Sequence, residues 1–120
     1  MKFELLMYMD PVVWQALTDQ QRNAVFIGHE AFQVKLVDSG ELLSTQAVAE
    51  PAESVTVRVI DGATIATSGV FQPAAAFMCG HYVVDCASQE RAVEIAALIP
   101  DAAYTGVEVR RIIHEADLRS

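Results

Sequence analysis

The feature that most constrains the fold is a helix with one apolar face in residues 18–37. Val25, His29, Phe32 and Leu36 recur at spacings of four, three and four residues. At about 100° per residue they share a narrow arc of one helix face, so another layer of the protein must cover them. A titratable imidazole in such a stripe is either a satisfied core residue or the floor of a site.

Both ends of this helix are predicted by the sequence. Thr18 is a suitable N-cap, and Gln21 at the third helical position completes a capping box. The helix should run to about Val37, because Asp38-Ser39-Gly40 follows and glycine readily takes the left-handed conformation beyond a helix end.

The rest of the chain alternates between strand patterns and one further helix. Ser88 caps that helix, and Pro100 stops it. Asp61-Gly62 is a strong hairpin signal. Strands are expected over residues 2–9, 41–49, 55–60, 64–67, 82–86 and 106–110. Two helices against one mostly antiparallel sheet predict a two-layer α+β sandwich with the ferredoxin-like split βαβ order, as a single domain over residues 1–120.

Charge and composition exclude several functions. The chain has 120 residues and a net charge of -8, which disfavours direct contact with nucleic acid or an anionic membrane. It has no apolar run of membrane-spanning length and no signal peptide, so we expect a cytoplasmic protein. Cys79 and Cys86 are too few for a disulfide scaffold and read best as buried thiols. Three histidines without clustered carboxylates indicate neither a metal site nor a cofactor.

A family resemblance extends over nearly the whole length. The chain resembles the YCII-related proteins, in the branch named for a DGPF motif. The motif is degenerate here, because Ser68-Gly69-Val70-Phe71 stands where Asp-Gly-Pro-Phe is usual, and Pro73–Ala76 replaces a segment that usually carries Glu and Lys. The resemblance rests on Asp10-Pro11, Trp14, His29, Phe32, Leu36, Asp38, Gly40, Pro51, residues 55–62, Thr67, Gly69, Phe71, Gly80, Tyr82, Asp85, Ser88, Ala92, Pro100 and residues 106–110.

The resemblance implies an assembly and a site. It implies that ferredoxin-like subunits dimerise through their sheets into an α/β barrel-like assembly, so we expect a homodimer. It also implies a His–Asp pair, which maps onto His29 and Asp38. A few relatives resemble enzymes that expel chloride from small hydroxylated or lactone rings by proton transfer. Others occur beside or fused to sigma factors.

Helix geometry opposes a direct His29–Asp38 pair. Nine residues separate them, which is about 900° of rotation and a rise of about 13 Å on one regular helix. They could converge only if the helix ends early or through a partner subunit. The alternative is that Asp38 serves the turn before Gly40 by accepting hydrogen bonds from backbone amides.

Tyr8 and Trp14 flank Asp10-Pro11 at the end of the first strand. They are candidates for the walls of a pocket that takes a small ring, and core packing or a dimer contact is the other interpretation. A second apolar strip, Ile27, Ala31 and Val34, lies opposite His29 on the same helix. A partner or a covering segment would shield it from water.

Two functions from different classes remain open at this point. In the first, the chain is an enzyme without a cofactor, and His29 is the general base in elimination or isomerisation of a small polar ring compound. In the second, the chain is a non-catalytic module that binds a small molecule or regulates transcription through a protein such as a sigma factor.

Overall fold

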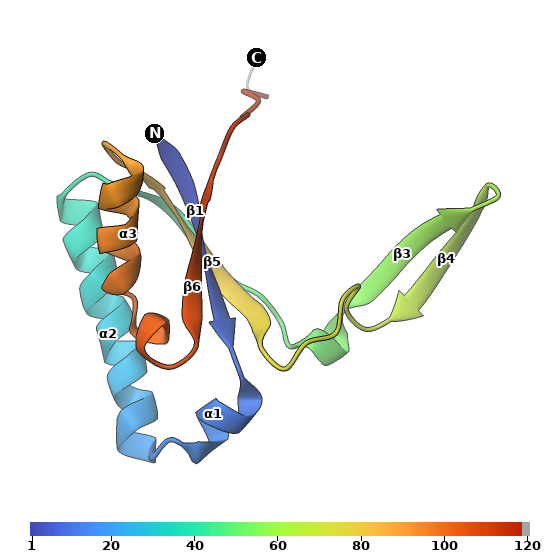
Figure 1. Ribbon diagram of the computed structural model, residues 1–120, viewed down its shortest axis with the longest axis horizontal. Coiled ribbons are helices and arrows are strands. Elements are labelled where there is room, and N and C mark those ends of the chain that lie inside the picture. The colour runs from blue at the N-terminus through green and yellow to red at the C-terminus, as the bar shows by residue number, and fades with distance from the viewer. Residues whose placement is uncertain (119–120) are drawn as a thin grey trace.

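The computed structural model describes residues 1–118 as a mixed α+β fold. Figure 1 shows the two long helices on one side of a four-stranded sheet and a hairpin standing apart on the other side. The sheet is antiparallel throughout, in the order β2-β5-β1-β6, which is compatible with the predicted ferredoxin-like arrangement. Its strands are β1 (Lys2–Met9), β2 (Leu42–Ala47), β5 (Phe77–Asp85) and β6 (Gly106–Arg111).

The helical layer contains the predicted long helix. This helix, α2 (Asp19–Asp38), carries the expected capping box, with the Gln21 amide donating to Thr18 Oγ1 over 3.1 Å. Gly40 adopts the left-handed conformation, with φ of 78°. The other helical segments are α1 (Pro11–Ala16), α3 (Gln89–Ala97) and the 3-10 turns η1 (Pro51–Glu53) and η2 (Pro100–Ala103). No helix within residues 1–118 combines the length and apolarity needed to cross a bilayer.

The core lies between the helices and one face of the sheet. Side chains of β1 alternate, so that Phe3, Leu5 and Met7 are buried under the helices while Leu6 and Tyr8 lie half-buried on the opposite, open face. Val25, Phe32 and Leu36 of the α2 stripe are buried in the same layer, as predicted. The strip formed by Ile27, Ala31 and Val34 is exposed.

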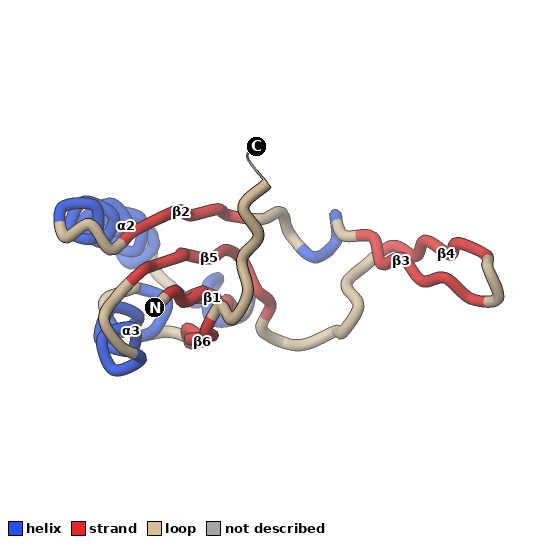
Figure 2. The backbone as a smooth tube through the Cα atoms, turned by 90° about the horizontal axis from the view of Figure 1, so that it is seen from above, coloured by secondary structure: helices blue, strands red, loops and turns tan. Residues whose placement is uncertain are grey.

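The hairpin is the main departure from the predicted fold. β3 (Val55–Ile60) and β4 (Ala63–Ser68) pair only with each other, as a separate two-stranded sheet (Figure 2). The Asp61-Gly62 turn was predicted correctly, and both residues have positive φ. Placing these strands in the main sheet was wrong, because β2 pairs directly with β5. Val55, Val57 and Val59 are therefore 61–68% exposed.

A close contact at Gly28 joins α2 to η2. A Cβ atom added at Gly28 would lie 2.7 Å from Cγ of Pro100, closer than real atoms approach. Gly28 is therefore required by packing, although glycine costs about 1 kcal/mol in a helix interior compared with alanine. The contact sets the distance between α2 and the turn that carries Asp101.

We predict that Gly28→Ala lowers the free energy of unfolding by about 1–2 kcal/mol, because overpacking against Pro100 outweighs the gain in helix propensity. Urea denaturation measures this change. Ala31→Gly on the exposed side of α2 is the control, and it should lose only the propensity difference of about 1 kcal/mol. A stabilised Gly28→Ala protein would contradict the prediction.

Candidate functional site

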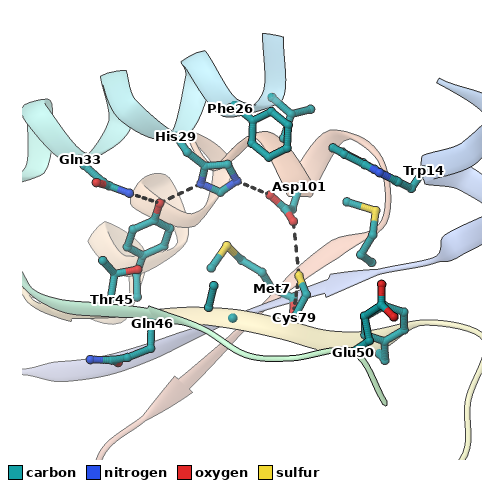
Figure 3. A pocket seen from close by; sticks show the side chains of 16 residues that line it. Met7, Trp14, Phe26, His29, Gln33, Thr45, Gln46, Glu50, Cys79 and Asp101 are labelled. Atoms are coloured by element: carbon teal, nitrogen blue, oxygen red, sulfur yellow. Dashed lines mark hydrogen bonds and ion pairs between the residues drawn. The ribbon is translucent and has the colours of Figure 1, made fainter. Parts of the chain in front are cut away.

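A cavity of about 450 Å³ lies between α2 and the sheet (Figure 3). Helical side chains from α1 and α2 cover it, strands β1, β2 and β5 form its floor, and η2 contributes one acid. Most of the surface that lines it is apolar. The lining residues are Met7, Met9, Trp14, Val25, Phe26, His29, Gln33, Thr45, Gln46, Ala47, Glu50, Phe77, Cys79, Gly80, Tyr82 and Asp101.

Both ring nitrogens of His29 are hydrogen-bonded at this cavity. Nε2 lies 2.7 Å from Oδ1 of Asp101, and Nδ1 lies 2.8 Å from the Tyr82 hydroxyl. A carboxylate only accepts, so Nε2 carries the proton and donates to Asp101. When the ring is neutral, Nδ1 accepts a hydrogen bond from the Tyr82 hydroxyl. The Gln33 amide donates to the Tyr82 oxygen over 3.1 Å. We call the three hydrogen-bonded residues Asp101, His29 and Tyr82 the Asp101–His29–Tyr82 relay.

Asp101 is a buried acid that pairs with His29, and no lysine or arginine within residues 1–118 bonds to it. Only 3% of its surface is exposed. Besides His29 it accepts from the Cys79 thiol, with Sγ 3.8 Å from Oδ2. Burial, reinforced by the negative charge of Asp101, raises the pKa of the Cys79 thiol to about 11. Cys79 is therefore a protonated donor at neutral pH and not a thiolate nucleophile.

Tyr82 is buried and packs against Phe32. Its ring centroid is 4.6 Å from that of Phe32, and the residue is only 1% exposed. Burial raises the pKa of the Tyr82 hydroxyl, and the charge of Asp101 adds to the increase. The hydroxyl consequently keeps its proton and donates it toward His29 in the resting state.

Comparison with known proteins identifies the family of this fold and site. The sequence model of the YCII-related domain matches residues 1–116. The chain belongs to the YCII-related family. It is also similar to a protein of Rhizobium meliloti (strain 1021) described only as uncharacterised, with 28% identity over 102 residues, 85% of this chain and 82% of the relative. The expected family membership is thereby confirmed, and neither comparison assigns an activity.

The YCII-related chain brings two of the four predicted site residues to the cavity. His29 lies in its wall, and Trp14 lines it from α1. Tyr8 lies on the open face of the sheet, where it lines a separate hollow with Asp10 and Thr105. The period of two in β1 explains this outcome, since Met7 and Met9 take the cavity side.

Asp38 is the fourth predicted residue, and it does not meet His29 within the chain. α2 runs without interruption from Asp19 to Asp38, so the helix does not end early. Asp38 is exposed in its last turn, about 13 Å of helix rise from His29. The carboxylate that bonds to His29 belongs to Asp101 instead.

Sequence reasoning missed Asp101, Tyr82, Gln33 and Cys79. Two of them carried a readable signal. Gln33 follows His29 by four residues and so shares its helix face. Tyr82 faces the core in an alternating strand, and a buried tyrosine hydroxyl needs a partner. Nothing local marks Asp101, because its position depends on the packing of η2 against Gly28.

The expected buried thiols are confirmed in part. Cys86 is buried and Cys79 is half-buried, and neither forms a disulfide. Within residues 1–118, no three or more His, Cys, Asp or Glu side chains gather in a way that could hold a metal ion.

The raised pKa of Cys79 predicts a thiol that is slow to alkylate. In a Cys86→Ser background, we expect the rate with iodoacetamide to rise with pH toward a midpoint of about 11. Asp101→Asn removes a negative charge that disfavours the Cys79 thiolate. Cys79 of this variant should therefore react roughly tenfold faster between pH 8 and 10. Asp38→Asn is the matched control and should leave the rate unchanged. Equal rates in all three proteins would show that Asp101 does not act on Cys79.

Proposed function

We propose that this YCII-related protein is an enzyme without a cofactor that moves protons on a small polar ring compound, with His29 as the general base. One observation carries the proposal: both nitrogens of His29 are engaged between an acid and a hydroxyl at the wall of a cavity. A histidine that served only the core would be sealed against a backbone carbonyl with no space beside it. An Asp–His pair that holds the ring in one tautomer is the arrangement that hydrolytic triads use.

The proton path follows from the direction of the hydrogen bonds. A substrate proton passes to the Tyr82 oxygen while the proton of the Tyr82 hydroxyl passes to Nδ1 of His29. The substrate is left with the electron pair, Tyr82 is neutral before and after, and His29 becomes an imidazolium. Asp101, 2.7 Å from Nε2, stabilises that positive charge. Tyr82 and His29 thus act as one unit, in which Tyr82 transfers the proton and His29 carries the added proton after the transfer.

The cavity limits the reaction class. It holds a molecule of the size of one substituted ring, and most of its lining is apolar. Removal of a ring proton leaves an electron pair that either forms a double bond as a leaving group departs or takes a proton back at another atom. The first course is elimination and the second is isomerisation, and both return the relay to its starting state after one proton is released or transferred.

We predict that a panel of small hydroxylated, chlorinated and lactone rings contains a compound that the protein eliminates or isomerises. NMR in D₂O and chloride release measure turnover. His29→Ala should lower kcat/KM by roughly 10²- to 10⁴-fold, the usual contribution of a general base. Tyr82→Phe keeps the ring but breaks the proton path, so it should reduce kcat more than it raises KM.

His81→Ala is the control, because His81 lies on the open face and contacts Glu4 at 2.7 Å instead of the cavity. Full turnover in His29→Ala would reject the proposal. A ligand that raises the melting temperature of the wild-type protein without being turned over would favour the ligand-binding or regulatory module instead. Asp38→Asn tests whether the Asp38 carboxylate of a partner subunit takes part in the reaction. Unchanged turnover in this variant would exclude that role.

We also propose that the chain is a homodimer that covers the open face of its sheet. Leu6, Tyr8 and Val83 lie half-buried there with no helix over them. The exposed hairpin adds a second unpartnered surface, and an isolated two-stranded ribbon is at best marginally stable in water. A second copy placed in the angle between the open face and the hairpin would cover both.

Sedimentation at micromolar concentration should therefore give the mass of two chains. Val83→Glu places a charge on the open face and should yield the mass of one chain, because a buried unpaired carboxylate strongly disfavours association. Val93→Glu, at an exposed position of α3, should remain dimeric. A single-chain mass for the wild-type protein would contradict the proposed dimer.

A further inference from the structure

The fixed charges on the described residues that line the cavity are all negative. Its lining includes two acids, Asp101 and Glu50, and no lysine or arginine. In the neutral His29 ring, Nδ1 accepts a hydrogen bond from the Tyr82 hydroxyl, so the resting relay adds no fixed positive charge. A ligand in this cavity therefore meets two carboxylates and no fixed positive charge.

Arg22 lies beside the cavity but is not available to a ligand. Its guanidinium donates to the carbonyl oxygens of Trp14 and Gln15 over 3.1 and 2.9 Å, and to Asp19 over 3.0 Å. These bonds fasten α1 to α2 and hold Trp14 in place. An anionic ligand would have to break them to obtain a basic partner.

The two acids differ in their surroundings. Asp101 is buried, and its charge contributes to the raised pKa values of both Cys79 and Tyr82, so its field reaches into the cavity. Glu50 is exposed at the start of η1, and no side chain within residues 1–118 bonds to its carboxylate. Figure 3 shows Glu50 on the far side of the cavity from His29. Its carboxylate is thus free to bind a ligand.

Aromatic rings complete the lining. Trp14 and Phe26 meet edge to face with centroids 5.7 Å apart, and Phe77 lines the same cavity. The face of an aromatic ring attracts a cation, most strongly for tryptophan. Apolar and aromatic walls together with the unpaired Glu50 carboxylate are the surroundings that bind an organic cation and disfavour an organic anion.

We infer that the cavity selects small ring compounds that carry a protonated nitrogen, accepts neutral ones less well and rejects carboxylates. Glu50 pairs with the cationic group, while the ring lies among the aromatic and methionine side chains. This inference rests on the proposed function only in using the same cavity. It assigns Glu50 as the residue that determines specificity for charge.

Three probes of nearly the same shape test the inference. Benzamidine is a cation, benzamide is neutral and benzoate is an anion at pH 7.5. Isothermal titration or ligand-observed NMR with the full chain should give affinities in that order, with benzamidine binding roughly tenfold or more tightly than benzoate. Glu50→Gln should weaken benzamidine severalfold and leave benzamide unchanged, because only a charge has been removed.

Glu53→Gln is the matched control. Glu53 lies three residues away in η1 and does not line the cavity, so the order and the affinities should stay as in the wild-type protein. Benzoate binding as tightly as benzamidine, an unchanged benzamidine affinity in Glu50→Gln, or no binding by any probe at millimolar concentration would each overturn the inference. The probe affinities are measured without turnover. The proposed function is therefore tested by the turnover of His29→Ala, and this inference is tested separately by the order of affinities for the three probes.

Discussion

The close approach of α2 to η2 is the constraint on which the site depends. Gly28 has no side chain, so Pro100 can pack where a Cβ atom would lie 2.7 Å from its ring. The next residue on each segment is a member of the relay: His29 follows Gly28, and Asp101 follows Pro100. Backbone packing therefore fixes the distance between the acid and the imidazole before any side-chain rotamer is chosen. A hydrogen bond of 2.7 Å between them is the result.

This arrangement buries the Asp101 carboxylate at a cost to the stability of the fold. A carboxylate that is 3% exposed loses much of its hydration, and a neutral histidine and a thiol compensate only in part. Groups buried at such a cost gather where chemistry needs them. Replacing Asp101 with a well-packed apolar residue could stabilise the fold, but it would leave His29 without the partner that sets its tautomer.

Sequence reasoning reached the elements of this fold through local signals. The α2 stripe, the Thr18 capping box, Gly40 and the Asp61-Gly62 turn are each determined by residues close together in the chain. Of the residues that line the cavity, the predicted set contained only His29 and Trp14, which depend on such local signals. Asp101 comes from a turn 72 residues after His29, and Tyr82 from a strand on the other layer. Their meeting depends on how layers pack, which periodicity does not encode.

The long excursion between β2 and β5 separates one segment of the chain from the cavity. These two strands are neighbours in the sheet. The chain therefore leaves the four-stranded sheet after β2, forms the hairpin, and re-enters the sheet beside β2 as β5. None of the described residues that line the cavity comes from residues 51–76. Substitutions in this segment therefore leave the described lining of the cavity unchanged. Ser68–Phe71 and Pro73–Ala76 both lie in this segment, so changes there leave the Asp101–His29–Tyr82 relay untouched.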